Sequence, residues 1–351
     1  FFYVAVISWI YQDRWEINNN DFIFALGRVF IAPTMFIVFL GLIDKPEHLK
    51  KLLIFYVLIF LLAFGSLGLQ NVYGHILFFG EDIYGLAENN TTRYGIIGYS
   101  SIIGSVNSYG VSFYTSVFII YFILKINPYL KGLLISFLFI GAVLVTSKAA
   151  FINIGICFLL LAFFFNINKN YKVILTTLFL MIISFLLVPI INEGLLAIYV
   201  NVTGHEVVEG LINDKTYEPI IDRALGRMYL DFEKHILFSS FKDYLIGVGI
   251  YAGGGVFILG NNATAHNSYL DAYLIGGLPF LIANISIIIA VQLQLLRYYF
   301  PEKNKLILTL FISNSLLFFN MLFYNGALFH PLISFPFWIS LVYILKFNIL
   351  K

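Results

Sequence analysis

The chain has 351 residues, of which 60% are hydrophobic and 11% are charged, and its mean hydropathy is +0.89. This composition excludes an ordinary soluble domain and indicates an integral membrane protein. The formal net charge of +2 carries no information about a partner, and no nucleic-acid partner is expected. The single cysteine, Cys157, lies in an apolar run, so neither a disulfide nor a cysteine metal site can form within the chain.

Apolar runs long enough for a helix to cross the roughly 30 Å of a bilayer's hydrocarbon core, which takes about 20 residues, recur along most of the chain. They predict spans at residues 22–43, 52–69, 96–124, 132–146, 149–166, 173–191, 268–296, 306–324 and 327–346. Residues 1–10 are interpreted as the end of one more span, because the sequence begins without methionine and enters in mid-helix. The expected fold class is therefore all-α, a polytopic transmembrane bundle of about ten or more helices.

Cations in alternate connections predict the orientation of these spans. Twelve of them fall in every second short connection: Lys45, Lys50, Lys51, Lys125, Lys131, Lys169, Lys172, Arg297, Lys303, Lys305, Lys346 and Lys351. The positive-inside rule places them in the cytoplasm, which leaves 11–21, 70–95, 147–148, 192–265 and 325–331 on the outer face. Three parts result: the N-terminal bundle 1–191, an outer loop 192–265, and the C-terminal bundle 266–351.

The outer loop is predicted to contain a short amphipathic helix on or near the membrane surface. After Pro219, apolar residues recur at spacings of three and four through Ile236, which makes one apolar stripe. Arg223 and Arg227 share its polar face, where like charges repel by a few tenths of a kcal/mol, and a bound anion would relieve that repulsion. The alternative is that Arg227 pairs with Asp231 while Arg223 faces solvent or lipid headgroups.

Glycines follow this predicted helix, at 247, 249, 253–255 and 260. A glycine-rich loop can hold phosphate, but the Gly-Lys-Ser/Thr ending of a nucleotide-binding loop is missing and no strand pattern precedes it. A nucleotide site is therefore rejected. The glycines are instead predicted to let the backbone bend closely over the membrane or over a substrate.

His266 is the candidate general base. Ser268 and Asp271 have the spacing of a capping box, which predicts that a membrane helix begins at about Tyr269. His266 would then lie just outside a helix N-terminus, whose partial positive charge disfavours the imidazolium, and a neutral ring can accept a proton. The alternative is that His266 hydrogen-bonds a loop carbonyl and only shapes the turn, since most histidines are structural or solvated.

Two further outer cations are functional suspects. Lys148 lies in a connection of two residues between two predicted spans, and a cation so close to the hydrocarbon boundary is a functional suspect, although extension towards lipid headgroups is an alternative. Arg93 follows a polar run and precedes a span, and it is the weaker candidate.

These features together resemble the O-antigen polymerase and O-antigen ligase superfamily of bacteria. The resemblance covers most of the chain from about residue 90 and rests on Ser-Lys-Ala-Ala at 147–150, the large outer loop with arginines, Gly-Val-Gly at 247–249, and Ala-His-Asn-Ser-Tyr-Leu-Asp-Ala-Tyr-Leu-Ile-Gly-Gly-Leu-Pro-Phe-Leu at 265–281. It implies a bundle of the GT-C kind with one large, partly helical periplasmic loop, located in the bacterial inner membrane with its active site facing the periplasm.

The resemblance also implies an activity and its residues. The expected reaction is transfer of a glycan from undecaprenyl pyrophosphate to a lipid-linked acceptor, catalysed without metal or cofactor and with inversion. His266 would be catalytic, and Arg223, Arg227, Lys148 and Arg93 would bind the pyrophosphate, although the family often has arginine in place of Lys148, which loses the bidentate fork.

Asn267 and Tyr269 are candidates for orienting sugar hydroxyls, and capping and interfacial anchoring are their alternatives. Besides the lipid-linked oligosaccharide and membrane lipid, a chain-length regulator protein is an expected partner. Two other functions stay open: a ligase that transfers the finished glycan to the lipid A core, and a flippase or exporter of lipid-linked oligosaccharide. A flippase would line its cavity with charges deep in several spans, whereas here they gather on one face, which favours the enzyme.

Overall fold

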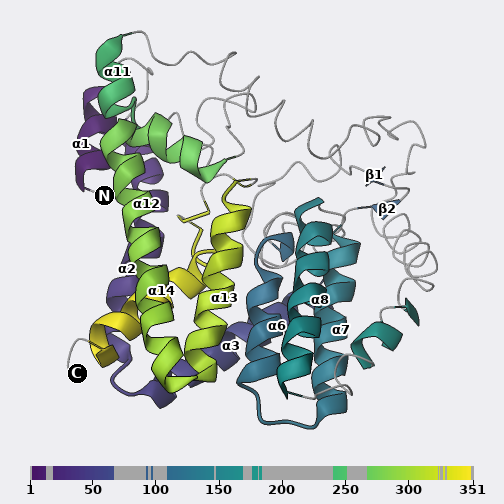
Figure 1. Cartoon of the computed structure of the whole chain (residues 1–351). Helices are drawn as coiled ribbons and strands as arrows, with labels where there is room; N and C mark the ends of the chain where they lie inside the picture. Colours follow the sequence, from purple (N-terminus) through teal and green to yellow (C-terminus); the bar gives the residue numbers. More distant parts are fainter. Residues whose placement is uncertain are drawn as a thin grey trace. The chain divides into compact units, whose positions relative to one another are not determined.

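A computed structural model defines the fold (Figure 1). It describes residues 2–12, 19–66, 92–93, 96–97, 109–145, 148–168, 176–180, 182–183, 240–250, 267–322, 324, 327–328 and 330–348.

Within these ranges the protein is almost entirely helical. The helices are α1 (Phe2–Ile10), α2 (Asn19–Leu42), α3 (Pro46–Gly65), α6 (Phe113–Phe122), α7 (Pro128–Leu144), α8 (Lys148–Asn168), α11 (Phe241–Ile246), α12 (Ser268–Glu302), α13 (Lys305–Asn320) and α14 (Phe335–Tyr343), which continues as a π-helix over Ile344–Asn348. Two strands of two residues each, β1 (Thr92–Arg93) and β2 (Ile96–Ile97), pair antiparallel with Thr92 opposite Ile97.

The chain divides into two compact units, which are described separately. The first comprises Phe1–Leu49 and Pro219–Lys351, and the second comprises Lys50–Glu218. The first unit therefore contains α1, α2 and α11 to α14, whereas the second contains most of α3 together with α6, α7 and α8.

Two helices among the described residues, α3 and α12, are long and apolar enough to cross a membrane. Their most apolar windows are only 33% and 39% buried inside the protein, whereas the core helix of a soluble protein would be mostly covered. Large apolar side chains are exposed on α12, among them Ile282, Ile289 and Leu293. An apolar helix surface of this kind fits a hydrocarbon surrounding.

Most predicted spans coincide with helices to within a few residues. Those at 22–43, 52–69, 132–146, 149–166, 268–296 and 306–324 correspond to α2, α3, α7, α8, α12 and α13. The predicted number of about ten spans stays a prediction, because α3 and α12 alone meet the criterion within the described ranges.

Two predicted spans begin too early. For 327–346, the described residues up to Ser334 form turns and α14 begins at Phe335; Pro331 explains this, because the residue before a proline is pushed away from the helical region. For 96–124, Ile96 and Ile97 pair as a strand, and residues 98–108 lie outside the described residues. Residues 109–110 are helical, and α6 follows a turn at residues 111–112.

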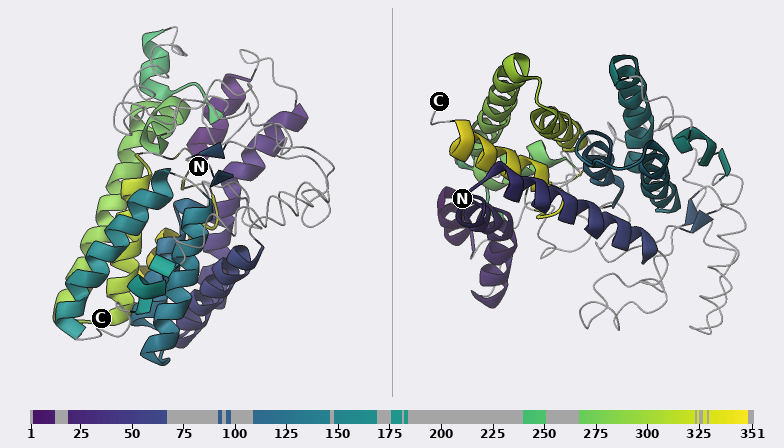
Figure 2. Two further views of the ribbon diagram at one scale, coloured as in Figure 1. Left: turned by 90° about the vertical axis from the view of Figure 1, so that its right-hand side faces the viewer. Right: turned by 90° about the horizontal axis from the view of Figure 1, so that it is seen from below.

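In the first unit α12 is the central helix. It packs against α13, α11, α1 and α14, and α14 also packs against α2. A tight turn joins α12 to α13 (Figures 1 and 2), in which Lys303 has a left-handed conformation with φ 46° and Asn304 caps α13 through a hydrogen bond from the Leu306 amide at 2.9 Å. This turn makes α12 and α13 neighbours that run in opposite directions.

In the second unit α6 is the central helix, and all ten of its residues are buried. It packs against α7 and α8. Asn153 of α8 donates from its side-chain amide to the Gly110 carbonyl at 2.8 Å, which joins α8 to the turn before α6. A helix that is apolar all round is buried in this way.

Candidate functional site at the start of α12

The candidate site is built around the N-terminus of α12, which directly follows the predicted base. Asn267 is the N-cap residue, and its side-chain oxygen accepts hydrogen bonds from the amides of Tyr269 at 2.9 Å and Leu270 at 3.1 Å. The predicted capping box of Ser268 and Asp271 is therefore wrong, although the helix begins within one residue of the expected place. An asparagine side chain at this position satisfies the exposed amides of the first turn.

Ser268 is used for a different purpose. Its backbone amide donates to the Met321 carbonyl at 2.8 Å, and its hydroxyl donates to the Tyr324 carbonyl and accepts from the Ala327 amide at 3.0 Å. One small residue thereby joins the start of α12 to the segment that follows α13.

The Tyr269 side chain is also engaged within the protein. Its hydroxyl donates to the Phe318 carbonyl in α13 at 3.0 Å. Of the roles that the sequence left open for Asn267 and Tyr269, capping is confirmed for Asn267, while Tyr269 uses its one donor to hold α12 against α13.

Helix α12 is broken in its third turn. Gly276 has φ −131° and ψ 15°, and Gly277 has φ 65° and ψ −163°. In an unbroken helix the carbonyls of Leu274 and Ile275 would accept from residues 278 and 279, but Pro279 has no amide hydrogen. The sequence Gly-Gly-Leu-Pro therefore interrupts the helix and leaves carbonyls that need other donors.

Residues 247–249 supply these donors. The amide of Val248 donates to the Leu274 carbonyl at 2.8 Å, and the amide of Gly249 donates to the Ile275 carbonyl at 3.0 Å. We call residues 247–249 and 274–277 together the glycine junction. It satisfies the broken helix with backbone groups from a distant part of the chain.

Glycine is needed at the junction because the two backbones touch. Gly247 has φ 79°, and a Cβ there would lie 2.5 Å from the Gly277 nitrogen. A Cβ on Gly277 would lie 2.2 Å from the Leu245 carbonyl oxygen. The glycines at 247 and 249 were predicted to allow a close approach to a membrane or substrate; in the structure they approach α12 and α1 of the same protein.

Helix α1 holds the other side of the segment 240–250. The Ser8 hydroxyl accepts from the Ile250 amide at 2.9 Å, and the Tyr3 hydroxyl donates to the Ile246 carbonyl at 3.1 Å. The Tyr11 hydroxyl donates to the buried Asp243 carboxylate. The short helix α11 is thus fixed between α1 and α12.

The other predicted site residues cannot be placed in this geometry. His266, Arg223 and Arg227 lie outside the described residues. Lys148 begins α8 and Arg93 lies in β1, and for these two the described part is the backbone alone. Their roles stay predictions.

A second histidine, which the sequence analysis did not single out, lies in the connection between α13 and α14. The His330 Nδ1 accepts from the Ile333 amide at 3.4 Å, and burial lowers the pKa of the ring to about 4. The imidazole is therefore neutral at pH 7, with its proton on Nε2. The pair His330-Pro331 in a predicted outer connection is the signal that could have drawn attention to it.

Comparison of the chain with models of protein families, with curated proteins and with solved structures found no match. The argument for function therefore depends on the residues themselves.

Proposed function

We propose that the protein is a glycosyltransferase of a bacterial inner membrane, a polymerase that transfers a glycan from an undecaprenyl-pyrophosphate donor to a lipid-linked acceptor. The observation that carries the proposal is the position of His266, directly before the residue that caps α12. Helix α12 is long and apolar enough to cross a membrane, so a titratable ring precedes the N-terminus of a candidate span.

The chemistry needs a base and a group of cations. The acceptor hydroxyl attacks the anomeric carbon, a new carbon–oxygen bond forms, and the bond from that carbon to the pyrophosphate oxygen breaks. His266 takes the proton of the hydroxyl, which is worth roughly 10²- to 10⁴-fold in rate. The configuration at the anomeric carbon is inverted, and undecaprenyl pyrophosphate leaves.

The departing pyrophosphate carries growing negative charge, which fixed cations stabilise. The proposal assigns this role to Arg223 and Arg227, with Lys148 and Arg93 as further contacts, and requires no metal ion. Asn267 and Tyr269 are left out of the sugar contacts, because the side-chain oxygen of the first and the hydroxyl of the second are engaged within the protein.

The deciding experiment offers one purified donor, an undecaprenyl-pyrophosphate repeat unit, with two alternative acceptors. A polymerase consumes the lipid-linked glycan and forms longer chains, whereas a ligase consumes the lipid A core oligosaccharide. If neither acceptor reacts, the transferase proposal fails, and movement of the donor across the bilayer becomes the function to measure.

The same assay tests the base. His266→Ala is expected to reduce elongation by about 10²- to 10⁴-fold, and His205→Ala, which changes another histidine of the outer loop, serves as the matched control. Full elongation by His266→Ala would remove His266 from the mechanism. Elongation is expected to persist in a chelator, and its loss would contradict the metal-free reaction.

A further inference from the structure

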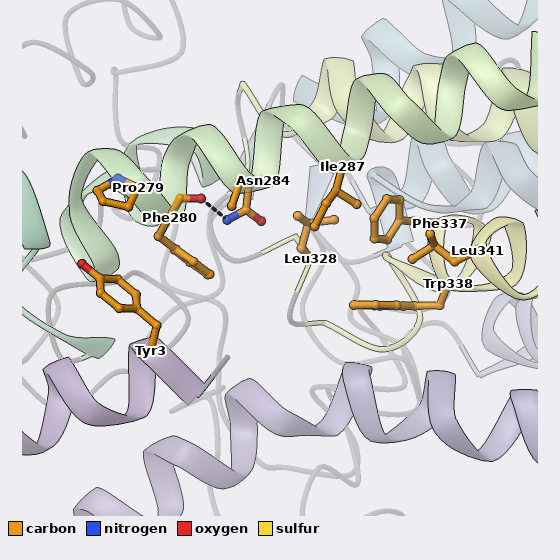
Figure 3. Close-up of a pocket in the computed structure, with 10 residues that line it drawn as sticks. Tyr3, Pro279, Phe280, Asn284, Ile287, Leu328, Phe337, Trp338 and Leu341 are labelled. Atoms are coloured by element: carbon orange, nitrogen blue, oxygen red, sulfur yellow. Dashed lines mark hydrogen bonds between the residues drawn. The ribbon is translucent and has the colours of Figure 1, made fainter. Parts of the chain in front are cut away.

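A cavity of about 340 Å³ lies along α12, just after the glycine junction (Figure 3). Its walls come from three helices of the first unit and one connection: Tyr3 of α1, residues from Pro279 to Ile287 of α12, Leu328, and Phe337, Trp338 and Leu341 of α14. Pro279 and Ile287 are eight residues apart, so the cavity extends for about 12 Å along the helix at ~1.5 Å per residue. Its volume is at the lower end of the ~300–1,000 Å³ usual for ligand sites.

The lining is apolar, and its few polar groups already have partners. Three of the lining side chains carry an N–H or O–H donor. The Asn284 amide donates to the Phe280 carbonyl at 2.7 Å, the Tyr3 hydroxyl donates to the Ile246 carbonyl at 3.1 Å, and the Trp338 indole donates to the Ser334 hydroxyl at 2.9 Å. A polar ligand would lose its water without equivalent hydrogen bonds, so the lining selects a hydrocarbon.

The cavity is continuous with the exposed apolar surface of α12. Ile287 lines the cavity and is itself 48% exposed. On the same face of α12, Pro279 and Ala283 also line the cavity and are exposed. The open side of the cavity therefore faces the medium that covers this helix, which for a candidate membrane span is the hydrocarbon of the bilayer.

We propose that this cavity binds one acyl chain of a membrane phospholipid. The elongated, largely apolar lining fits an unbranched chain that lies along α12. In a bilayer, phospholipid chains surround the exposed surface of α12 at high concentration. Mass action therefore favours their binding over that of less abundant lipids. The bound chain fills the space between α1, α12 and α14, and this site does not depend on the proposed transferase activity.

Photo-crosslinking tests the occupant without changing the protein. The wild-type chain is reconstituted with a phospholipid that carries a photoactivatable group in its acyl chain, and the crosslinked residues are mapped by mass spectrometry. Insertion is expected at the buried residues Phe337 and Trp338 as well as at the exposed Ile282 and Ile289. Crosslinks confined to the exposed residues would overturn the proposal. Insertion at Phe337 and Trp338 by a photoactivatable polyprenyl phosphate in preference to the phospholipid would assign the cavity to a carrier lipid instead.

A pair of matched variants tests the cavity itself. Ala283→Phe places a ring in the cavity, whereas Ile289→Phe places a ring on the opposite, exposed face of α12. After purification in detergent, the wild type and Ile289→Phe are expected to retain phospholipid in native mass spectra, and Ala283→Phe is expected to lose it. Equal retention by both variants, or no phospholipid on the wild type, would contradict the proposal.

Discussion

His330 illustrates how burial alone decides the charge of a side chain. The ring Nδ1 of His330 accepts a hydrogen bond from the Ile333 amide. The backbone carbonyl of His330 accepts two more, from the Ser334 amide at 2.9 Å and from the Ser334 hydroxyl at 2.8 Å. That hydroxyl accepts in turn from the Trp338 indole. The backbone carbonyl of His330 therefore ends a short chain of hydrogen bonds at the start of α14. A charge on the buried imidazole would cost desolvation free energy.

A pH dependence of stability follows from this burial. The pKa of His330 is about 4 in the folded protein against 6.5 for the unperturbed group, so the unfolded state binds more protons between these values. Stability is therefore expected to fall as the pH is lowered from about 6.5 to about 4. The midpoint of thermal unfolding, recorded in detergent across this pH range, measures the change in stability.

The matched variants for this measurement are His330→Gln and His48→Gln. The first is expected to have a flatter pH profile than the wild type over this range. The second, at a histidine in the first turn of α3, controls for the loss of a histidine as such. Identical pH profiles for the wild type and His330→Gln would contradict the assignment of this pH dependence to His330.

At the scale of an element, the break in α12 is explained by its own sequence together with a distant one. Pro279 removes one helical donor, and the amides of Val248 and Gly249 replace the lost hydrogen bonds. The start of α12 is fixed separately, through Asn267 and Ser268. The eight residues 268–275 are consequently held at both ends.

Gly277→Ala should destabilise the protein. At φ 65° a side chain costs roughly 1–2 kcal/mol, and its Cβ would overlap the Leu245 carbonyl oxygen, which adds to that cost. The expected result is a lower midpoint of thermal unfolding. The control is Gly27→Ala in α2, where a Cβ meets nothing within 4 Å and is expected to stabilise the helix by roughly 0.5–1 kcal/mol. A Gly277→Ala protein as stable as the wild type would mean that the junction does not form as described.

At the scale of the molecule, contacts within the first unit agree with the alternation of cations. Asp44, after α2, pairs with Lys346, after α14, at 2.9 Å, and this ammonium lowers the pKa of the carboxyl. Both residues belong to connections predicted to be cytoplasmic. Ser268 and the segment 321–327, which are in contact, both lie at the predicted outer end.

Two exposed lysines provide a direct test of this topology. In a Cys157→Ala background, which removes the single, buried thiol, Lys242→Cys and Lys45→Cys are labelled with a membrane-impermeant maleimide in spheroplasts. Lys242→Cys is expected to react, and Lys45→Cys to react only after the membrane is opened. Labelling of both without permeabilisation, or of Lys45→Cys alone, would contradict the orientation.

Most helices could be predicted because apolar runs are a local signal. The runs that became α2, α3, α7, α8, α12 and α13 needed no knowledge of their neighbours. The start of α14 was missed because the effect of Pro331 was not weighed against the apolar run around it. The cap was assigned one residue late, since Asn267 and Ser268 are both good capping residues and the contacts of Ser268 with residues 324 and 327 are not visible in the sequence.

The glycine junction could be predicted only in part. The glycines at 247 and 249 were predicted to let the backbone bend, whereas the break at Gly276 and Gly277 was not predicted, because 268–296 was interpreted as one span. The two hydrogen bonds of the junction each join residues 26 positions apart, and no periodicity reports such a contact. The proposed site residues His266, Arg223 and Arg227 are the reverse case: they lie outside the described residues, and their roles come from the sequence alone.

The backbones of residues 247–249 and α12 meet through amide groups, carbonyl oxygens and glycines that lack side chains, and Val248 packs against Leu274 beside them. Selection on such a contact acts on a few glycines, one proline and this apolar pair. Distant relatives would then share this small set of residues within otherwise dissimilar sequences. They would be found by searching for an interrupted apolar helix whose missing amide donors come from an upstream Gly-x-Gly.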